Sequence, residues 1–110
     1  MEKIISPLKS SSKLEELTLL IARHAPSDGT HTSLVPELCF RRASHVSEPK
    51  HTVNLPSLYV VAQGSKTATL AGEDYKYDPS TYMVSSVHLP VIGQITEASP
   101  ELPYLSLQLL

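Results

Sequence analysis

The five histidines come first as candidates for chemistry, because imidazole binds metals and transfers protons near neutral pH. They are His24, His31, His45, His51 and His88. A metal site inside a β-barrel needs a His-x-His pair, whose members face the same side of a strand, followed by a Glu and a further His. No His-x-His pair occurs, and Tyr82 stands where the last histidine would belong. The sequence therefore predicts no metal site and favours histidines on the surface or in turns.

The other nucleophiles and acid–base groups lack the surroundings that catalysis requires. Cys39 is the single cysteine, so no disulfide forms within the chain, and no basic helix terminus stands beside it to activate the thiol. Ser85 lies outside any Gly-x-Ser-x-Gly sequence. Glu73 and Asp74 are neighbours in a predicted turn, and the four glycines form no phosphate-binding loop. We therefore predict no catalytic residue and no cofactor.

One set of alternating residues is compatible with the binding of a small molecule. Apolar and hydroxyl side chains occupy alternate positions of neighbouring predicted strands, a mixture that suits an apolar cavity with a few orienting polar groups. The set comprises Tyr59, Val61, Thr67, Thr69, Met83 and Ser85. The same alternation fits an ordinary filled interior whose threonines face solvent, so the pattern alone leaves both interpretations open.

Length and charge limit the classes of function. With 110 residues the chain forms one domain with one modest core. Its formal net charge is -2, and its densest basic cluster is the pair Arg41 and Arg42, which is not the basic surface of a domain that binds DNA alone. The sequence contains neither the apolar core of a signal peptide nor a run of about 20 apolar residues. We therefore expect a cytoplasmic protein without membrane contact.

One helix and a series of short strands should position these residues. A capping box at residues 12–15 and apolar residues at helical spacing predict a helix over residues 12–24, behind a flexible N-terminal arm at residues 1–11. Residues 43–56 are polar, contain two prolines and indicate a long loop or an edge. Alternating segments separated by turn residues predict strands at residues 38–42, 58–63, 66–70, 75–77, 81–87, 91–98 and 104–110. Such spacing is typical of a β-sandwich or barrel.

Long stretches of the chain resemble a known family. They are PSLYVVAQGSK, GEDYKYDPSTYMV and SVHLPVIGQITEASPELPYLSL, together with RHAPSDGTHTSLVPELCFRR nearer the N-terminus. Over about residues 17–110 the sequence is similar to the N-terminal domain of a subgroup of AraC-type bacterial transcriptional regulators. One departure is His88, which stands where an acidic residue is expected in this pattern. If that position contacts an effector, His88 implies a different ligand for this chain.

The resemblance implies a mainly β fold, namely a cupin-like jelly-roll barrel of short antiparallel strands with an N-terminal helix. It implies that residues 12–110 sense a small-molecule effector and form a homodimer. DNA would be bound only through a C-terminal helix-turn-helix domain that this chain does not include, and we expect a truncation after Leu110. Two other functions stay open: a small metal-dependent cupin enzyme, and a structural dimerisation module with a filled barrel.

Overall fold

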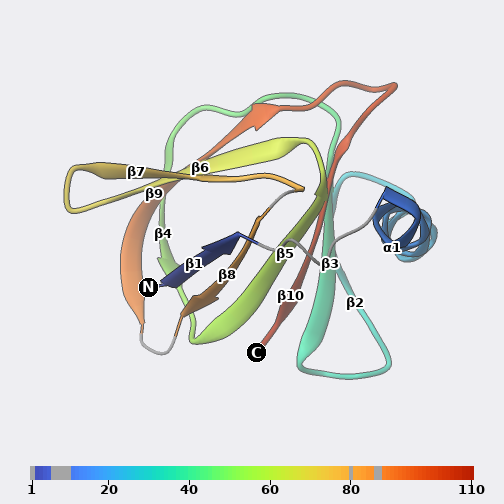
Figure 1. The fold of residues 1–110 in the computed structure, drawn as a ribbon, viewed down its shortest axis with the longest axis horizontal. Helices are drawn as coiled ribbons and strands as arrows, with labels where there is room; N and C mark the ends of the chain where they lie inside the picture. The colour runs from blue at the N-terminus through green and yellow to red at the C-terminus, as the bar shows by residue number, and fades with distance from the viewer. Residues whose placement is uncertain (1, 6–10, 80, 86–87) are drawn as a thin grey trace.

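Two antiparallel β-sheets and one helix make up the computed structural model of the chain (Figure 1). It describes residues 2–5, 11–79, 81–85 and 88–110. The large sheet has the strand order β1-β8-β5-β10-β3-β2, and the small sheet has the order β4-β9-β6-β7. The mainly β prediction with an N-terminal helix is thus confirmed. The two sheets are compatible with a jelly roll, although their hydrogen bonds do not close into one continuous barrel.

The strands are short, and the helix lies between the first and the second of them along the chain. The helix predicted over residues 12–24 is confirmed, as are the main predicted strands. The elements are β1 (Glu2–Ile5), α1 (Ser11–His24), β2 (Gly29–Thr32), β3 (Leu38–Ala43), β4 (Lys50–Asn54), β5 (Ser57–Gln63), β6 (Ser65–Leu70), β7 (Glu73–Tyr77), β8 (Thr81–Ser85), β9 (Leu89–Glu97) and β10 (Tyr104–Leu109).

Of three strands at sheet edges, β1 and β2 are not predicted from the sequence, and β4 agrees with the edge that was one of two alternatives for residues 43–56. β1 lies in the segment expected to be an arm and pairs with β8; residues 6–10 of that segment lie outside the described residues. β2 and β4 are the last strands of their sheets, and β4 follows Pro49. Edge strands are often short and polar, because one side of the backbone stays unpaired and one face is open to water. Their sequences therefore carry little of the apolar alternation by which strands are recognised.

The chain crosses from one sheet to the other at Gly64. Although β5 and β6 are consecutive, β5 pairs with β8 and β10, whereas β6 pairs with β7 and β9. Gly64 adopts a φ of +78°, and a Cβ placed there would collide with the carbonyl oxygen of Glu97 and lie 3.0 Å from Cα of Tyr104. A side chain is thus excluded both by the backbone conformation and by the close approach of β9 and β10.

Helix α1 packs on the outer face of the large sheet, over β5, β10 and β3 (Figure 1). Ile21 has no exposed surface and belongs to an outer core with Phe40, Ala62 and Leu105. Thr18 Oγ1 donates a hydrogen bond of 3.3 Å to the carbonyl of Ala62. The apolar stripe of the helix therefore packs on its own sheet rather than waiting for a partner chain.

A second, inner core lies between the two sheets. Its buried residues come from six strands and from both sheets, so this core holds the sheets together. They are Val61, Ala68, Tyr77, Met83, Val91 and Tyr104. The large sheet is thus covered on both faces, by α1 on the outer side and by the small sheet on the inner side.

We predict that Ile21→Ala lowers the free energy of unfolding by about 2–4 kcal/mol, because it removes a fully buried side chain and leaves a cavity. Leu19→Ala on the same helix should change it by less than about 0.5 kcal/mol, since Leu19 is 69% exposed. Urea unfolding followed by circular dichroism measures both. Equal effects of the two substitutions would contradict the packing of α1 described above.

Gly64→Ala should lower the free energy of unfolding by about 2–4 kcal/mol, through backbone strain together with the collision against β9. The matched control is Gly72→Ala in the β6–β7 turn, where φ is +81° but no atom lies within 4 Å of an added Cβ. Strain alone predicts a loss of about 1 kcal/mol at that site. Thermal unfolding of both variants separates strain from collision, and a loss at Gly64 no larger than at Gly72 would refute the collision.

Candidate functional site

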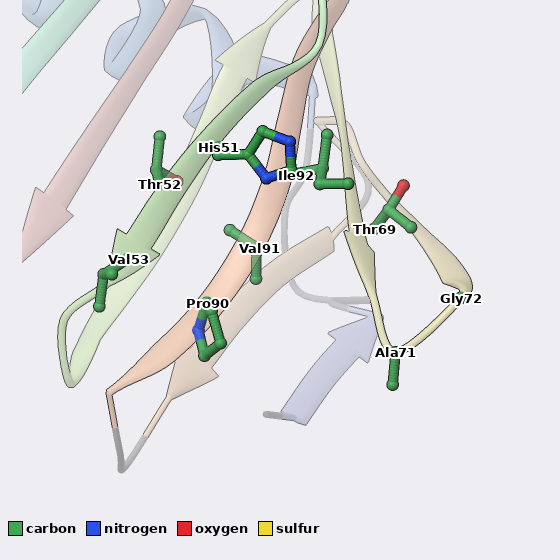
Figure 2. Close-up of a pocket in the computed structure, with 9 residues that line it drawn as sticks. All are labelled: His51, Thr52, Val53, Thr69, Ala71, Gly72, Pro90, Val91 and Ile92. Carbon is green, nitrogen blue, oxygen red and sulfur yellow. The ribbon is translucent and has the colours of Figure 1, made fainter.

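A hollow of about 570 Å³ lies on the outer face of the small sheet (Figure 2). Three consecutive residues of β4 and three of β9, with Val91 of the inner core among them, line it next to the turn between β6 and β7. The lining is mostly apolar, and the Thr69 hydroxyl already donates a hydrogen bond of 2.5 Å to Asp74. His51 contributes the one ring with polar atoms in this lining. Converging polar groups that would orient a ligand are not present in this hollow.

The structure brings together four of the seven residues predicted to line a pocket. Tyr59, Val61 and Met83 belong to the inner core or pack against it, and Ser85 is buried beside them on β8. The remaining three, Thr67, Thr69 and His88, are not brought to this place. The two threonines lie on the outer face of β6, and His88 is exposed between β8 and β9.

The two threonines of β6 face outward because the chain crosses to the other sheet at Gly64. If β5 and β6 formed a hairpin in one sheet, their odd-numbered residues would share a face, as the sequence pattern suggests. Because β6 enters the other sheet, its even-numbered residues Lys66 and Ala68 face inward and pair with Tyr77 and Tyr75. A lysine thus occupies the inner face, and the threonines face outward, as in the alternative of a filled interior.

At one end of the inner face of the large sheet, the polar side chains are joined to one another by hydrogen bonds. Gln108 on β10 lies level with Cys39 on β3 and Tyr59 on β5. Its amide nitrogen donates a hydrogen bond of 3.1 Å to Ser57 Oγ, which in turn donates one of 2.7 Å to the carbonyl of Leu55. The Cys39 thiol donates weakly to Gln108 Oε1 over 3.9 Å. These groups need no ligand to complete their hydrogen bonding.

The neighbouring set of paired residues on the same face does not have such hydrogen-bond partners. Ser106 on β10 lies level with Arg41 on β3 and Val61 on β5. Ser106 is 1% exposed, and its Oγ has no hydrogen-bond partner among the described residues. Burial raises the pKa of the Tyr104 hydroxyl and the nearby Ser106 lowers it, although Ser106 Oγ itself is without a hydrogen-bond partner among the described residues. A buried hydroxyl without a partner is uncommon and costs stability.

Two cationic side chains approach this row from opposite sheets. The guanidinium carbon of Arg41 lies 5.9 Å from the centre of the Tyr59 ring, within the range of a cation–π interaction. Lys66 comes from the small sheet and lies over Gly93, where an added Cβ would be 3.1 Å from Lys66 Cε and 3.6 Å from Nζ. Burial lowers the pKa of Lys66, and the charge of Arg41 lowers that pKa further. The two cations therefore repel each other in a poorly hydrated interior.

No carboxylate balances these charges within the part of the chain that the structure describes. The ion pairs found there are Arg42 with Asp28 at 4.0 Å and Lys76 with Glu97 at 3.1 Å, both on the outside of the fold. Neither Arg41 nor Lys66 takes part in them. Two like charges at a partly buried place cost stability when no opposite charge offsets their loss of hydration.

The tyrosines of the inner core are neutral hydrogen-bond donors. Burial raises the pKa of Tyr77 well above the usual range, and it also raises the pKa values of Tyr104 and Tyr59. The positive charge of Arg41 partly offsets the rise at Tyr59 and Tyr104. Guanidinium, ammonium, serine hydroxyl and neutral phenols all donate hydrogen bonds, so this interior is suited to an acceptor with negative charge.

A metal cation does not fit this interior, because Arg41 and Lys66 would repel it. The histidines do not converge either: His24 and His31 each bond a backbone carbonyl four residues earlier, and His45, His51 and His88 are exposed. Among the described residues, no three His, Cys, Asp or Glu side chains gather in one place. The groups that do gather in the interior are donors for binding rather than metal ligands or a catalytic pair.

Sequence reasoning missed the donors Arg41, Lys66, Tyr77, Tyr104 and Ser106. Two signals were available. In YLSLQLL, leucines alternate with Tyr104, Ser106 and a glutamine, which indicates a strand with one apolar and one polar face. Arg41 alternates with Phe40 in the same way. What the sequence could not show is that α1 covers the apolar face, which turns the polar face inward.

Replacing Lys66 by methionine should raise the free energy of unfolding by about 1 kcal/mol, since it removes an unpaired cation from the interior and keeps an unbranched apolar chain. The matched control is Lys76→Met on the outer face of the neighbouring strand, where the side chain is 55% exposed. That change should have an effect of about 0.5 kcal/mol or less. Urea unfolding at neutral pH compares the two, and destabilisation by Lys66→Met beyond that of the control would refute the unpaired charge.

The advantage of Lys66→Met should depend on pH. The pKa of Lys66 in the folded protein lies below its ordinary value of 10.5, so between the two values the unfolded chain binds more protons. Wild-type stability therefore rises with pH in that window, and the difference from Lys66→Met shrinks as the pH approaches 10.5. The buried tyrosines lose stability above pH 10 in both proteins, so their effect cancels. Unfolding at pH 7 and pH 10.5 tests this, and a constant difference would contradict it.

Comparison with known proteins agrees with the architecture. The family described as AraC-type transcriptional regulator N-terminus matches residues 34–110, well over half of the chain, and this region runs from before β3 to the end of β10. No curated protein and no solved structure matches the chain significantly. Within the described residues, no helix is both long and apolar enough to cross a bilayer. The chain therefore belongs to the family of N-terminal domains of AraC-type transcriptional regulators.

Proposed function

We propose that residues 12–110 form an effector-sensing and dimerisation domain, which binds a small molecule between its two sheets and controls an attached helix-turn-helix DNA-binding domain. Membership of the regulator family supports the regulatory role. The observation that carries the sensing role is the buried Ser106 Oγ, which lacks a hydrogen-bond partner among the described residues and lies on the same face as Arg41. A buried polar group without a partner is typical of binding sites, where stability is given up for function.

The position of Arg41 and Ser106 in the fold is suitable for regulation. β10 and β3 carry Ser106 and Arg41 on their inner faces, and on their outer faces they hold α1 through Leu105 and Phe40. A ligand that contacts the inner face thus touches the two strands that support the helix. Such a ligand shifts the regulator between two states only as far as its affinities for those states differ.

Two alternative functions are less well supported. A metal-dependent cupin enzyme needs several metal-binding side chains at one place, and the interior offers two cations there instead. A purely structural dimerisation module with a filled interior has one observation in its favour, namely the well-packed inner core with Val61, Met83 and Val91. It gives no reason for two unpaired cations inside. A ligand screen separates this alternative from the sensing domain.

Sensing and dimerisation can be tested in one reporter assay. The 110-residue chain is fused to a DNA-binding domain that represses its promoter only as a dimer, and reporter output is measured with and without compounds that stabilise the chain in a thermal-shift screen. We expect the fusion to repress, and at least one stabilising compound to change the repression several-fold. Screening neutral as well as charged metabolites keeps this test independent of ligand class.

A fusion that does not repress, together with a monomer in light scattering at concentrations of about 100 μM, would exclude the dimerisation role. A repressing fusion that responds to none of the stabilising compounds would instead favour the structural dimerisation module. The control is the unfused DNA-binding domain, which should not repress.

A further inference from the structure

We propose that the space between the sheets binds an organic carboxylate, held by Arg41 from the large sheet and Lys66 from the small sheet, with Ser106 Oγ donating a hydrogen bond to it. This inference rests on the proposed sensing function and deepens it by naming the chemical class of the ligand. The three groups belong to β3, β6 and β10 and approach the same interior from both sheets.

Register places two of the three groups side by side. Arg41 and Ser106 are paired residues of adjacent antiparallel strands and point to the same inner face. The fork of a guanidinium donates two parallel hydrogen bonds to a carboxylate, and a serine next to it can donate a further one. The Ser106 hydroxyl, which is buried and unpartnered among the described residues, supplies an observation independent of the charges.

Gly93 makes room for the third group. Lys66 crosses over the backbone of β9 at the one residue without a side chain, and a Cβ there would press on Cε and approach Nζ at 3.6 Å. The ammonium reaches the interior from the sheet opposite Arg41, close enough for Arg41 to lower the pKa of Lys66. A carboxylate between the two cations removes their repulsion and supplies the acceptor that neither finds among the described residues.

The surroundings decide what the rest of the ligand is. Val61, Met83 and Val91 are apolar walls of the inner core, and Tyr59 and Tyr77 add aromatic faces. An amino acid would bring an ammonium group, for which no carboxylate is at hand among the described residues. A sugar would need several acceptors, whereas Gln108 Oε1 is already used by the Cys39 thiol. An apolar or aromatic body with one carboxylate matches both the two cations and the apolar side chains around them.

Arg41 and Lys66 indicate the side from which a ligand would approach, because both side chains are long and each keeps part of its surface exposed. The hollow of Figure 2 is a different place, since most of its lining residues lie on the outer face of the small sheet, although Val91 also lines it.

The test uses two carboxylate probes with uncharged counterparts. The melting temperature of the 110-residue chain is measured with benzoate or octanoate at about 10 mM, and with benzyl alcohol or octan-1-ol at the same concentration or at saturation. Sodium chloride is added to the alcohol samples to match ionic strength. We expect at least one carboxylate to raise the melting temperature by about 5 °C and its alcohol to leave it nearly unchanged.

Variants locate the effect. Arg41→Gln and Lys66→Met should each weaken binding of the stabilising carboxylate at least tenfold, and Ser106→Ala about threefold to tenfold. The matched controls are Arg42→Gln on the outer face of β3 and Lys76→Met on the outer face of β7, which should bind as the wild type does. Gly93→Ala should weaken binding by displacing Lys66 while leaving every charge in place. Circular dichroism confirms that each variant is folded.

Three results would overturn the carboxylate site: failure of both carboxylates to stabilise the wild type, equal stabilisation by the alcohols, or unchanged binding in both Arg41→Gln and Lys66→Met. None of these touches the sensing function, which stands if a neutral compound stabilises the chain and switches the reporter fusion. Conversely, a fusion that never responds would remove the sensing function even where carboxylate binding is intact. The two proposals therefore fail separately.

Discussion

Most of this structure depends on one constraint: β10 runs through the large sheet with both of its faces covered. Leu105 and Leu107 face α1, while Tyr104, Ser106 and Gln108 face the small sheet. A strand covered on both sides is ordinarily apolar on both. Here the apolar face of β10 packs against the helix. Its polar face points into an interior in which every hydroxyl and amide needs a hydrogen-bond partner. The outer core thus creates the polarity of the inner one.

The inner face meets that requirement only in part. At one end, Gln108 donates a hydrogen bond to Ser57, which donates one to the carbonyl of Leu55. Next to it, Ser106 has no hydrogen-bond partner, and the two cations take part in neither ion pair of the described residues. Replacement by apolar residues of similar size would ordinarily improve stability at such a place. The hydrogen-bonded side chains of Gln108 and Ser57 show that the fold can complete its polar contacts on this face. Ligand binding is therefore a better explanation than poor packing for the missing hydrogen bond of Ser106.

Much of the fold could be predicted from the sequence, and the candidate site only in part. The apolar stripe of α1, formed by Leu14, Leu17 and Ile21, is a local pattern, and so is the alternation in the strands. Both can be recognised in the sequence without knowledge of the tertiary structure. Tyr59, Val61 and Met83 were placed correctly inside for the same reason. The inward face of β6 depends on the crossing at Gly64, which moves Lys66 inside and Thr67 outside. Whether a glycine turn makes a hairpin or joins two sheets depends on distant strands, in this case β9 and β10.

The family match includes the strands of the inner core but not the helix of the outer core. It covers residues 34–110 and thus every strand that contributes a donor to the inner face, whereas α1 lies before it. The helix covers β3 and β10 through Phe40 and Leu105, each next in sequence to a residue of the donor row, Arg41 and Ser106. Adjacent residues of a strand face opposite sides and share one backbone, so a displacement that draws Arg41 and Ser106 toward an anion also shifts the surface on which Ile21 packs. Any effect of ligand on the position of α1 therefore passes through β3 and β10 rather than through the small sheet.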